Sequence, residues 1–271
     1  MVYFTGFDSA WGGKAPGAMC DLQEVAGALQ FVGAPRRLSW DEAIRRVDDW
    51  ASWDDHVVAI DQSLIVPNDT GMRPVERRLQ SALMHPFRCG AHASNTGNER
   101  CFGSTAGIWR FVDALVRRGY RQEPMAVARA ERGRFFFECY PHPALLGLFD
   151  LDAVLRYKHR SGDAEAWREA LRLVRSLGEP GRAPRLVGVE QQVPADWRHT
   201  KEHEDLLDAI VSAYVAAFFR AHGTVRSLMV GDLASGYMVT PVSARTGAAL
   251  RAAFGDDVNV EGVASSQRPS R

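Results

Sequence analysis

The segment HVVAIDQSLIVP (56–67) decides the predicted fold class. Its apolar run, Val57–Ile60, is continuous rather than alternating, which is typical of a strand buried on both faces of a sheet. The preceding segment SWDEAIRRVDDWAS (39–52) has a helical pattern, and Ser39 is in position to cap its first turn. Because VYFTGFD (2–8) is typical of an earlier strand, the order strand, helix, strand predicts a parallel crossover and therefore an α/β sheet.

Further strands and helices are predicted on both sides of this strand in the sequence. AMCDL (18–22) is expected to return after a turn as a second strand, and GALQFVGA (27–34) to form a third. Further elements are predicted as helices over 73–84, 106–120, 142–158 and 163–178 and from Lys201 onward, a hairpin over 125–141, and a strand pair within 229–243. Turn-forming residues predict a long loop over 85–104, and the tail ASSQRPSR (264–271) is expected to be disordered.

The composition is that of a globular protein without a charge bias. Of 271 residues, 46% are hydrophobic, and 33 Lys and Arg balance 33 Asp and Glu. The chain lacks the basic excess of many nucleic-acid-binding proteins, so contact with nucleic acid would depend on a local patch. It has no apolar run of membrane-spanning length, no secretion signal and no Cys-x-x-Cys pair, and we expect a cytoplasmic protein with reduced thiols and no membrane partner. The absence of Walker, GxSxG, HExxH and GxGxxG motifs argues against P-loop, serine-hydrolase and dinucleotide-binding chemistry.

Acidic residues end three of the predicted strands. Asp8 ends the first strand, Asp61 follows the run Val57–Ile60, and Glu138 ends RFFFE. Ligand-binding and catalytic groups of open α/β sheets gather at strand ends. If the first strand neighbours the strand of Asp61, then Asp8 and Asp61 lie side by side.

A second group of acids begins a long apolar helix, in HEDLLDAI (203–210). Asp205 and Asp208 are three residues apart and therefore share a helix face. A helix packed across the strands would deliver both to Asp8 and Asp61. Carboxylate oxygens are the ligands that Mg²⁺ and Mn²⁺ prefer, and two such ions about 3.5–4 Å apart can activate water and stabilise the leaving oxygen in phosphodiester hydrolysis. We therefore predict a carboxylate cluster that binds Mg²⁺ or Mn²⁺.

Each acid also has a structural explanation that the sequence leaves open. Aspartates after strands often cap turns, and acids in a first helical turn are stabilised by the helix dipole. Glu138 could pair with an arginine such as Arg134. A different metal site, in which zinc binds in the long loop, would use His85, Cys89, His92 and Cys101.

Four sequence blocks point to a known family. They are GFDSAW (6–11), AIDQSLIVPNDTGMRPVERRL (59–79), FFECYPHPALLGLFDLDAVLRYK (136–158) and EDLLDAIVSAYVAA (204–217). In this order they resemble the DUF429 family, which is described as predicted nucleases with an RNase H-like fold. The last block is also similar to a helix of Holliday-junction resolvases.

The resemblance implies an RNase H-like α/β fold, with a five-stranded mixed sheet whose first three strands are antiparallel and with helices on both faces. It also implies metal-binding acids on the first strand, the fourth strand and a late helix. These acids would be Asp8, Asp61 and the pair Asp205 and Asp208, with Glu138 matching a further block of the family. Asp205 and Glu138 would serve as further ligands or as bases.

Basic residues near these blocks are candidates for binding a phosphate. They are Arg73, Arg77, His142 and Lys158. Arg73 begins a helix, where main-chain amides also favour anions. Structural explanations stay open here too: Arg77 could pair with Glu76, His142 lies between two prolines, and the helix dipole favours a lysine at a helix C-terminus.

These expectations combine into one hypothesis. We expect a single RNase H-like domain over residues 1–245 with a helical and loop insertion around 70–120, followed by a partly disordered C-terminal extension (246–271). The domain would be a Mg²⁺- or Mn²⁺-dependent phosphodiesterase, a nuclease that hydrolyses DNA or RNA with a metal-activated water. The alternative is a non-catalytic RNase H-like module that binds nucleic acid or a nucleotide.

Overall fold

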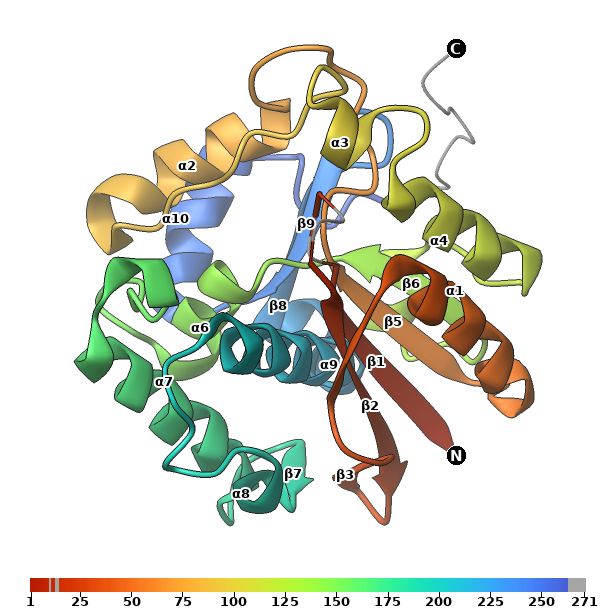
Figure 1. Ribbon diagram of the computed structural model, residues 1–271. Helices are drawn as coiled ribbons and strands as arrows, with labels where there is room; N and C mark the ends of the chain where they lie inside the picture. Colours follow the sequence, from red (N-terminus) through yellow and green to blue (C-terminus); the bar gives the residue numbers. More distant parts are fainter. Residues whose placement is uncertain (10, 13–14, 263–271) are drawn as a thin grey trace.

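The computed structural model describes residues 1–9, 11–12 and 15–262 (Figure 1). The strands are β1 (Val2–Asp8), β2 (Gly17–Val25), β3 (Ala28–Phe31), β4 (Arg36–Leu38), β5 (His56–Asp61), β6 (Arg134–Glu138), β7 (Arg185–Val187), β8 (Ser227–Asp232) and β9 (Gly236–Pro241). The α-helices are α1 (Trp40–Asp49), α2 (Pro74–Phe87), α3 (Glu99–Phe102), α4 (Gly107–Arg117), α5 (Pro124–Ala128), α6 (Pro141–Phe149), α7 (Ala164–Arg175), α8 (Val189–Gln192), α9 (Lys201–Arg226) and α10 (Ala244–Phe254). The tail 264–271, which was predicted to be disordered, lies outside the described residues.

One mixed sheet organises the described part of the chain. Its strands lie in the order β6-β5-β1-β2-β3-β7, with β4 beside β2. Strands β1, β2 and β3 are successively antiparallel, while β5 and β6 run parallel to β1. The predicted α/β class with three antiparallel first strands is confirmed, but the expected count of five strands is wrong, because this sheet has seven. The additional strands β4 and β7 are three residues long, too short to give a pattern in the sequence.

The chain enters β5 through α1, as the sequence predicts. Ser39 caps α1 by accepting a hydrogen bond from the amide of Glu42, whose carboxylate accepts one from the amide of Ser39 at 2.8 Å. The apolar run of β5 is buried on both faces, since Val57 and Val58 pack into two different hydrophobic clusters. This burial holds β5 at the centre of the fold.

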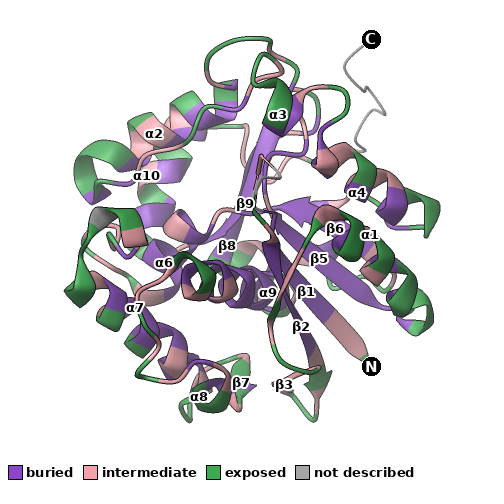
Figure 2. Cartoon of the chain, in the orientation of Figure 1, coloured by how far each residue is buried: buried purple, intermediate pink, exposed green. Residues whose placement is uncertain are grey.

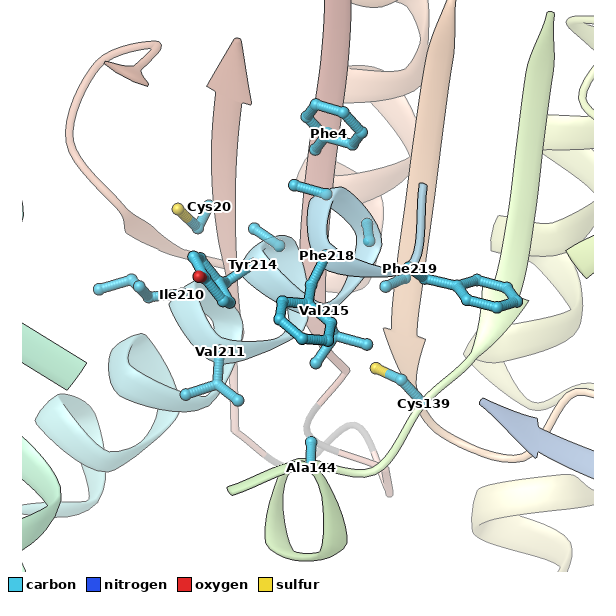
Figure 3. Close-up of a cluster of buried hydrophobic side chains, with 14 of the residues drawn as sticks. Phe4, Cys20, Cys139, Ala144, Ile210, Val211, Tyr214, Val215, Phe218 and Phe219 are labelled. Atoms are coloured by element: carbon cyan, nitrogen blue, oxygen red, sulfur yellow. The ribbon is translucent and has the colours of Figure 1, made fainter. Parts of the chain in front are cut away.

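Helices cover both faces of the sheet, whose central strands are buried between them (Figures 1 and 2). On one face α9 packs across β1, β2 and β5. Figure 3 shows part of the cluster formed there, with Phe4 and Cys20 of the sheet, Ala144 of α6, and Ile210, Val211, Tyr214, Val215, Phe218 and Phe219 of α9. On the other face, Phe7 and Ile60 pack with residues of α1 and α4.

A second sheet of two strands, β8 and β9, forms from the predicted strand pair. It packs with α2, α6 and α10. Helix α10 lies in the segment that was expected to be a C-terminal extension, and Arg78 of α2 binds it by donating to the carbonyls of Ala253 and Phe254 at 3.1 and 2.7 Å. Residues 246–254 are therefore part of the packed structure. Within the described ranges, no helix has the length and apolarity needed to cross a membrane.

Three predicted elements are wrong in part. The predicted loop over 85–104 includes the end of α2 and the short helix α3. Residues 125–141 do not form a hairpin, because α5 precedes β6 and β6 pairs parallel with β5. Pro124 at the first helical position favours that helix, and β6 pairs with the buried strand β5. The helix predicted over 142–158 ends at Phe149, because Asp150 adopts a left-handed conformation with φ 48°.

The sheet and α9 approach each other closely at Gly6 of β1. A Cβ atom at this position would lie 2.1 Å from the carbonyl oxygen of Ala209 and 2.2 Å from the amide nitrogen of Ala213, both in α9. The backbone of α9 therefore rests directly on β1. Only glycine leaves room for this contact.

We expect Gly6→Ala to lower the free energy of unfolding by about 3 kcal/mol or more, because the added methyl group must displace helix backbone. Urea unfolding followed by circular dichroism measures the loss. The control is Gly247→Ala in α10, where a Cβ atom would meet only Val242 at 3.5 Å. Alanine favours a helix there by roughly 0.5–1 kcal/mol over glycine. Equal unfolding midpoints for the two variants would contradict the close packing of α9 on β1.

Candidate functional site

The register of β1 and β5 places two of the predicted acids beside each other. Asp8 and Asp61 are paired residues of the parallel ladder and are the last residues of their strands. Paired residues of neighbouring strands point to the same face of a sheet. Gly6 contacts α9, and Asp8 lies two residues further along the strand, so both aspartates lie on the face that α9 covers.

The first turns of α9 deliver the second pair of acids. Asp208 is fully buried and accepts a hydrogen bond from the hydroxyl of Tyr157 at 2.5 Å. Asp205 accepts one from Lys201 Nζ at 2.5 Å. Its other oxygen, Oδ2, is buried and has no hydrogen bond, although Arg37 Nη2 lies 3.6 Å from it.

Two lysines bind the acids of α9. Lys158 Nζ forms ion pairs with Asp208 and, at 3.3 Å, with Glu204, and Lys201 Nζ lies 3.1 Å from Glu204. Glu204 also accepts a hydrogen bond from the amide of His159 at 2.8 Å. Lys158 was predicted from the sequence to bind a phosphate, whereas Glu204 and Lys201 were not predicted as site residues. Their spacing of three residues on the same helix face could have identified both.

The electrostatics of the acids join them into one cluster. Burial, reinforced by the charge of Asp208, raises the pKa of Asp8 to about 7. Burial and the charge of Asp8 raise the pKa of Asp61 well above its usual range. Glu204 differs: burial opposes its ionisation, but the charge of Lys158 lowers its pKa to about 2. Negative charge at Asp8 and Asp61 is therefore costly in the absence of a further cation.

The donor set suits a hard divalent cation. Carboxylate oxygens are the ligands that such ions prefer, and Asp205 Oδ2 is a buried acceptor without a donor. As the described side chains stand, no three His, Cys, Asp or Glu residues are grouped so as to hold a metal ion. Lysine and tyrosine donors bind the oxygens of Asp208 instead. Metal binding here would require some of the carboxylates to rotate.

Glu138 does not join the acids of the cluster, although it lines the same small pocket as Asp61. Its register pairs it with Ile60 rather than with Asp61, so its side chain leaves the sheet on the opposite face. There Arg73 donates from Nη1 and Nη2 to the two carboxylate oxygens, at 2.9 and 2.5 Å. Glu138 therefore pairs with an arginine, as one of the explanations from the sequence proposed. The partner is Arg73 rather than Arg134.

The two candidate arginines have different surroundings. Arg73 is fully buried, and its Nε also donates to Glu76 at 2.7 Å. A phosphate could reach Arg73 only if this network opened. Arg77 is exposed on α2 and donates to the carbonyl of Met72 rather than to Glu76.

His142 lies close to the acidic cluster. Its ring packs edge-on against Tyr157 with centroids 5.2 Å apart, and its Nδ1 lies 3.3 Å from the hydroxyl of Tyr140. Its Nε2 is buried without a hydrogen-bond partner. Burial, together with the charge of Lys158, lowers the pKa of His142 to about 3. A neutral imidazole at this position offers hydrogen bonding to a ligand but no charge.

A small pocket opens beside Asp61. Its lining includes Trp11, His92 and Tyr140. The indole of Trp11 donates to the carbonyl of Asp61 at 2.9 Å, which ties the turn after β1 to the end of β5.

The residues of the possible zinc site do not assemble. His85 and His92 are exposed, whereas Cys89 and Cys101 are buried in two different hydrophobic clusters. Burial raises the pKa of the Cys89 thiol to about 12, which disfavours the thiolate that zinc requires.

Fold and site together define an α/β protein in which two parallel strand ends and one helix collect buried carboxylates around lysine side chains. The model of the family described as "Protein of unknown function (DUF429)" matches residues 6–232. The chain therefore belongs to the DUF429 family. No curated protein and no solved structure gives a significant match.

We expect Arg73→Met to destabilise the protein by about 3–5 kcal/mol, because it leaves the buried carboxylates of Glu76 and Glu138 without their shared cation. Urea unfolding measures the change. The matched control is Arg77→Met on the exposed side of the same helix, for which we expect a change below about 0.5 kcal/mol. A similarly small loss in Arg73→Met would argue against a structural role for this ion network.

His142 should make stability depend on pH. The unfolded chain takes up a proton near pH 6.5, whereas the folded protein resists protonation of His142 down to about pH 3. Between these values the unfolded state binds more protons, so stability falls as the pH falls, by at most about 1.4 kcal/mol per pH unit from this group. In His142→Asn the loss of unfolding free energy between pH 6.5 and 4.5 should be smaller than in the wild type. Urea unfolding at several pH values tests this, and parallel profiles would exclude the effect.

Proposed function

We propose that this protein is a Mg²⁺- or Mn²⁺-dependent phosphodiesterase, a nuclease that hydrolyses nucleic acid. The observation that carries the proposal is the meeting of Asp8, Asp61 and Asp208, which come from two neighbouring parallel strands and the helix packed across them. Burial raises the pKa values of Asp8 and Asp61, and carboxylates with raised pKa values are typical of functional sites.

The topology supports the proposal. Within the sheet, the order β3-β2-β1-β5-β6, with three antiparallel strands and two further strands parallel to β1, agrees with the RNase H-like arrangement that the family resemblance implies. That arrangement assigns metal-binding acids to the first strand, the fourth strand and a late helix. Here these elements are β1, β5 and α9. An RNase H-like fold is therefore part of the proposal.

The side chains suggest separate roles. Asp8 and Asp61 would hold the cation between adjacent strand ends, with Asp208 facing them. Asp205 would contribute through its Oδ2, which accepts no hydrogen bond. A bound divalent ion would supply an activated water and neutralise charge on the phosphate. Glu138 would act indirectly, because it accepts a hydrogen bond from the amide of Leu64 and so fixes the segment that follows Asp61.

Cationic groups at the rim of the cluster suit a phosphodiester substrate. The side chains of Lys158 and Lys201 are 33% and 50% exposed, so both can contact the acids and a bound phosphate. Lysine binds phosphate oxygens as a point charge. Because the chain has no net charge, we propose that contact with nucleic acid is confined to this local region.

A non-catalytic module that binds nucleic acid or a nucleotide is the second candidate. The ion pairs of Lys158 and Lys201 favour it, because they satisfy carboxylates of α9 without a metal. In such a module the lysines would bind phosphate, and a divalent ion would change nothing.

Calorimetric titration with Mn²⁺ separates these candidates. We expect saturable binding by the wild type, and binding at least tenfold weaker in Asp8→Asn, because one of the two carboxylates at the adjacent strand ends becomes neutral. The matched control is Asp232→Asn. Asp232 also ends a strand, but its carboxylate caps the next turn by accepting from the amides of Ala234 and Ser235 at 2.7 and 2.6 Å. This variant should bind Mn²⁺ like the wild type.

Hydrolysis of branched, single-stranded and RNA–DNA hybrid oligonucleotides is measured in parallel, with Asp61→Asn as the inactive control. Cleavage that requires Mn²⁺ or Mg²⁺ and is lost in Asp61→Asn is the expected result. Oligonucleotide binding without any effect of Mn²⁺ would instead support the non-catalytic module.

A further inference from the structure

Lysine is rare in this chain, and two of its few positions contact the candidate site. Of the 33 cationic residues only three are lysine, at positions 14, 158 and 201, and the other 30 are arginine. Lys158 and Lys201 both form ion pairs with acids of α9. Arginine presents a planar fork with donors in fixed directions, whereas lysine is a compact point charge on a flexible stem. The site therefore holds both of the described lysines, together with Arg37, in a chain whose other described cations are arginines.

The net charge of the described cluster matches one divalent ion. Its acids are Asp8, Asp61, Glu204, Asp205 and Asp208, and its cationic side chains are Lys158, Lys201 and Arg37. Five carboxylates and three cations leave two negative charges when all are ionised. One divalent ion neutralises this net charge of the described side chains, whereas two would give them an excess of positive charge.

Each oxygen of Asp208 already accepts a hydrogen bond from the chain itself. Its Oδ1 accepts from the hydroxyl of Tyr157 at 2.5 Å, and its Oδ2 accepts from Lys158 Nζ. A second divalent ion on Asp208 would have to displace the ammonium group or remain beside it against like-charge repulsion.

The segment that carries Lys158 is fixed in place. His199 Nε2 lies 2.7 Å from the carbonyl of Tyr157, and the amide of His159 donates to Glu204 at 2.8 Å. The ammonium group also lies 5.1 Å from the centroid of the Tyr157 ring. These contacts hold the lysine against α9, which makes its displacement by an ion costly.

We propose that the site binds a single divalent ion, at Asp8 and Asp61, and that the ammonium group of Lys158 takes the place of a second ion on Asp208. This inference rests on the proposed function and narrows it to a phosphodiesterase with one metal ion and one lysine as its cations. Lys158 neutralises Asp208, and its exposed part contacts a phosphate oxygen of the bound substrate.

The test is the stoichiometry and spin coupling of bound Mn²⁺ in the full chain, measured by calorimetry and electron paramagnetic resonance. The wild type should bind one ion with an uncoupled six-line spectrum. Lys158→Met, with Lys158→Gln as a second neutral variant, should bind two ions with an exchange-coupled spectrum, because Asp208 becomes available. Thermal unfolding of each variant establishes that it is folded before titration.

Lys201→Met is the matched control, since it removes the same charge from the same cluster but leaves the contacts of Asp208 intact. It should bind one ion, with at most a change in affinity. Two coupled ions in the wild type, or one ion in both folded Lys158 variants, would overturn the inference while leaving a metal-dependent site. No Mn²⁺ binding by the wild type, with or without oligonucleotide, would overturn the proposed function as well.

Discussion

The contact between the backbone of α9 and Gly6 of β1 is the constraint on which the site depends. A helix held at this distance from the sheet places Asp208, the neighbour of Ala209, close to the end of β1, where Asp8 lies two residues beyond Gly6. A side chain at Gly6 would lift the helix and move Asp208 away from the strand ends. The close packing of α9 on Gly6, at Ala209 and Ala213, is therefore needed to position the acids as well as to fill the core.

Bringing like charges together in a buried site costs stability. The fold offsets this cost more at the acids of α9 than at the strand ends. Lys158 and Lys201 bind the acids of α9, so that Glu204 is ionised even at low pH. Burial instead raises the pKa values of Asp8 and Asp61 and so favours their protonation. The negative charge that remains is therefore concentrated at the two strand ends, where a diffusible cation gains most by binding.

The sequence predicted which elements carry the acids, because the ends of β1 and β5 and the first turns of α9 can be recognised from local sequence patterns. It could not predict the register of β6. Glu138 ends its strand as Asp61 does, yet it pairs with Ile60, and a shift of one residue sends a side chain to the opposite face. The short strands β4 and β7 were missed for a related reason, since their place depends on neighbouring strands rather than on a pattern of their own.

The rarity of lysine in the sequence could also have pointed to the site, in addition to the pattern of acids. In a chain whose cations are almost all arginine, a lysine marks a position where a planar fork does not fit or where a point charge is needed. Lys158 satisfies the second condition, because it contacts Asp208 and Glu204 with one nitrogen atom. Both candidate functions use this lysine, as a partner of the metal ion in one and as the phosphate ligand in the other. What separates them is the effect of a ligand on the raised pKa values of Asp8 and Asp61, because a phosphate alone would add negative charge there and a divalent ion would neutralise it.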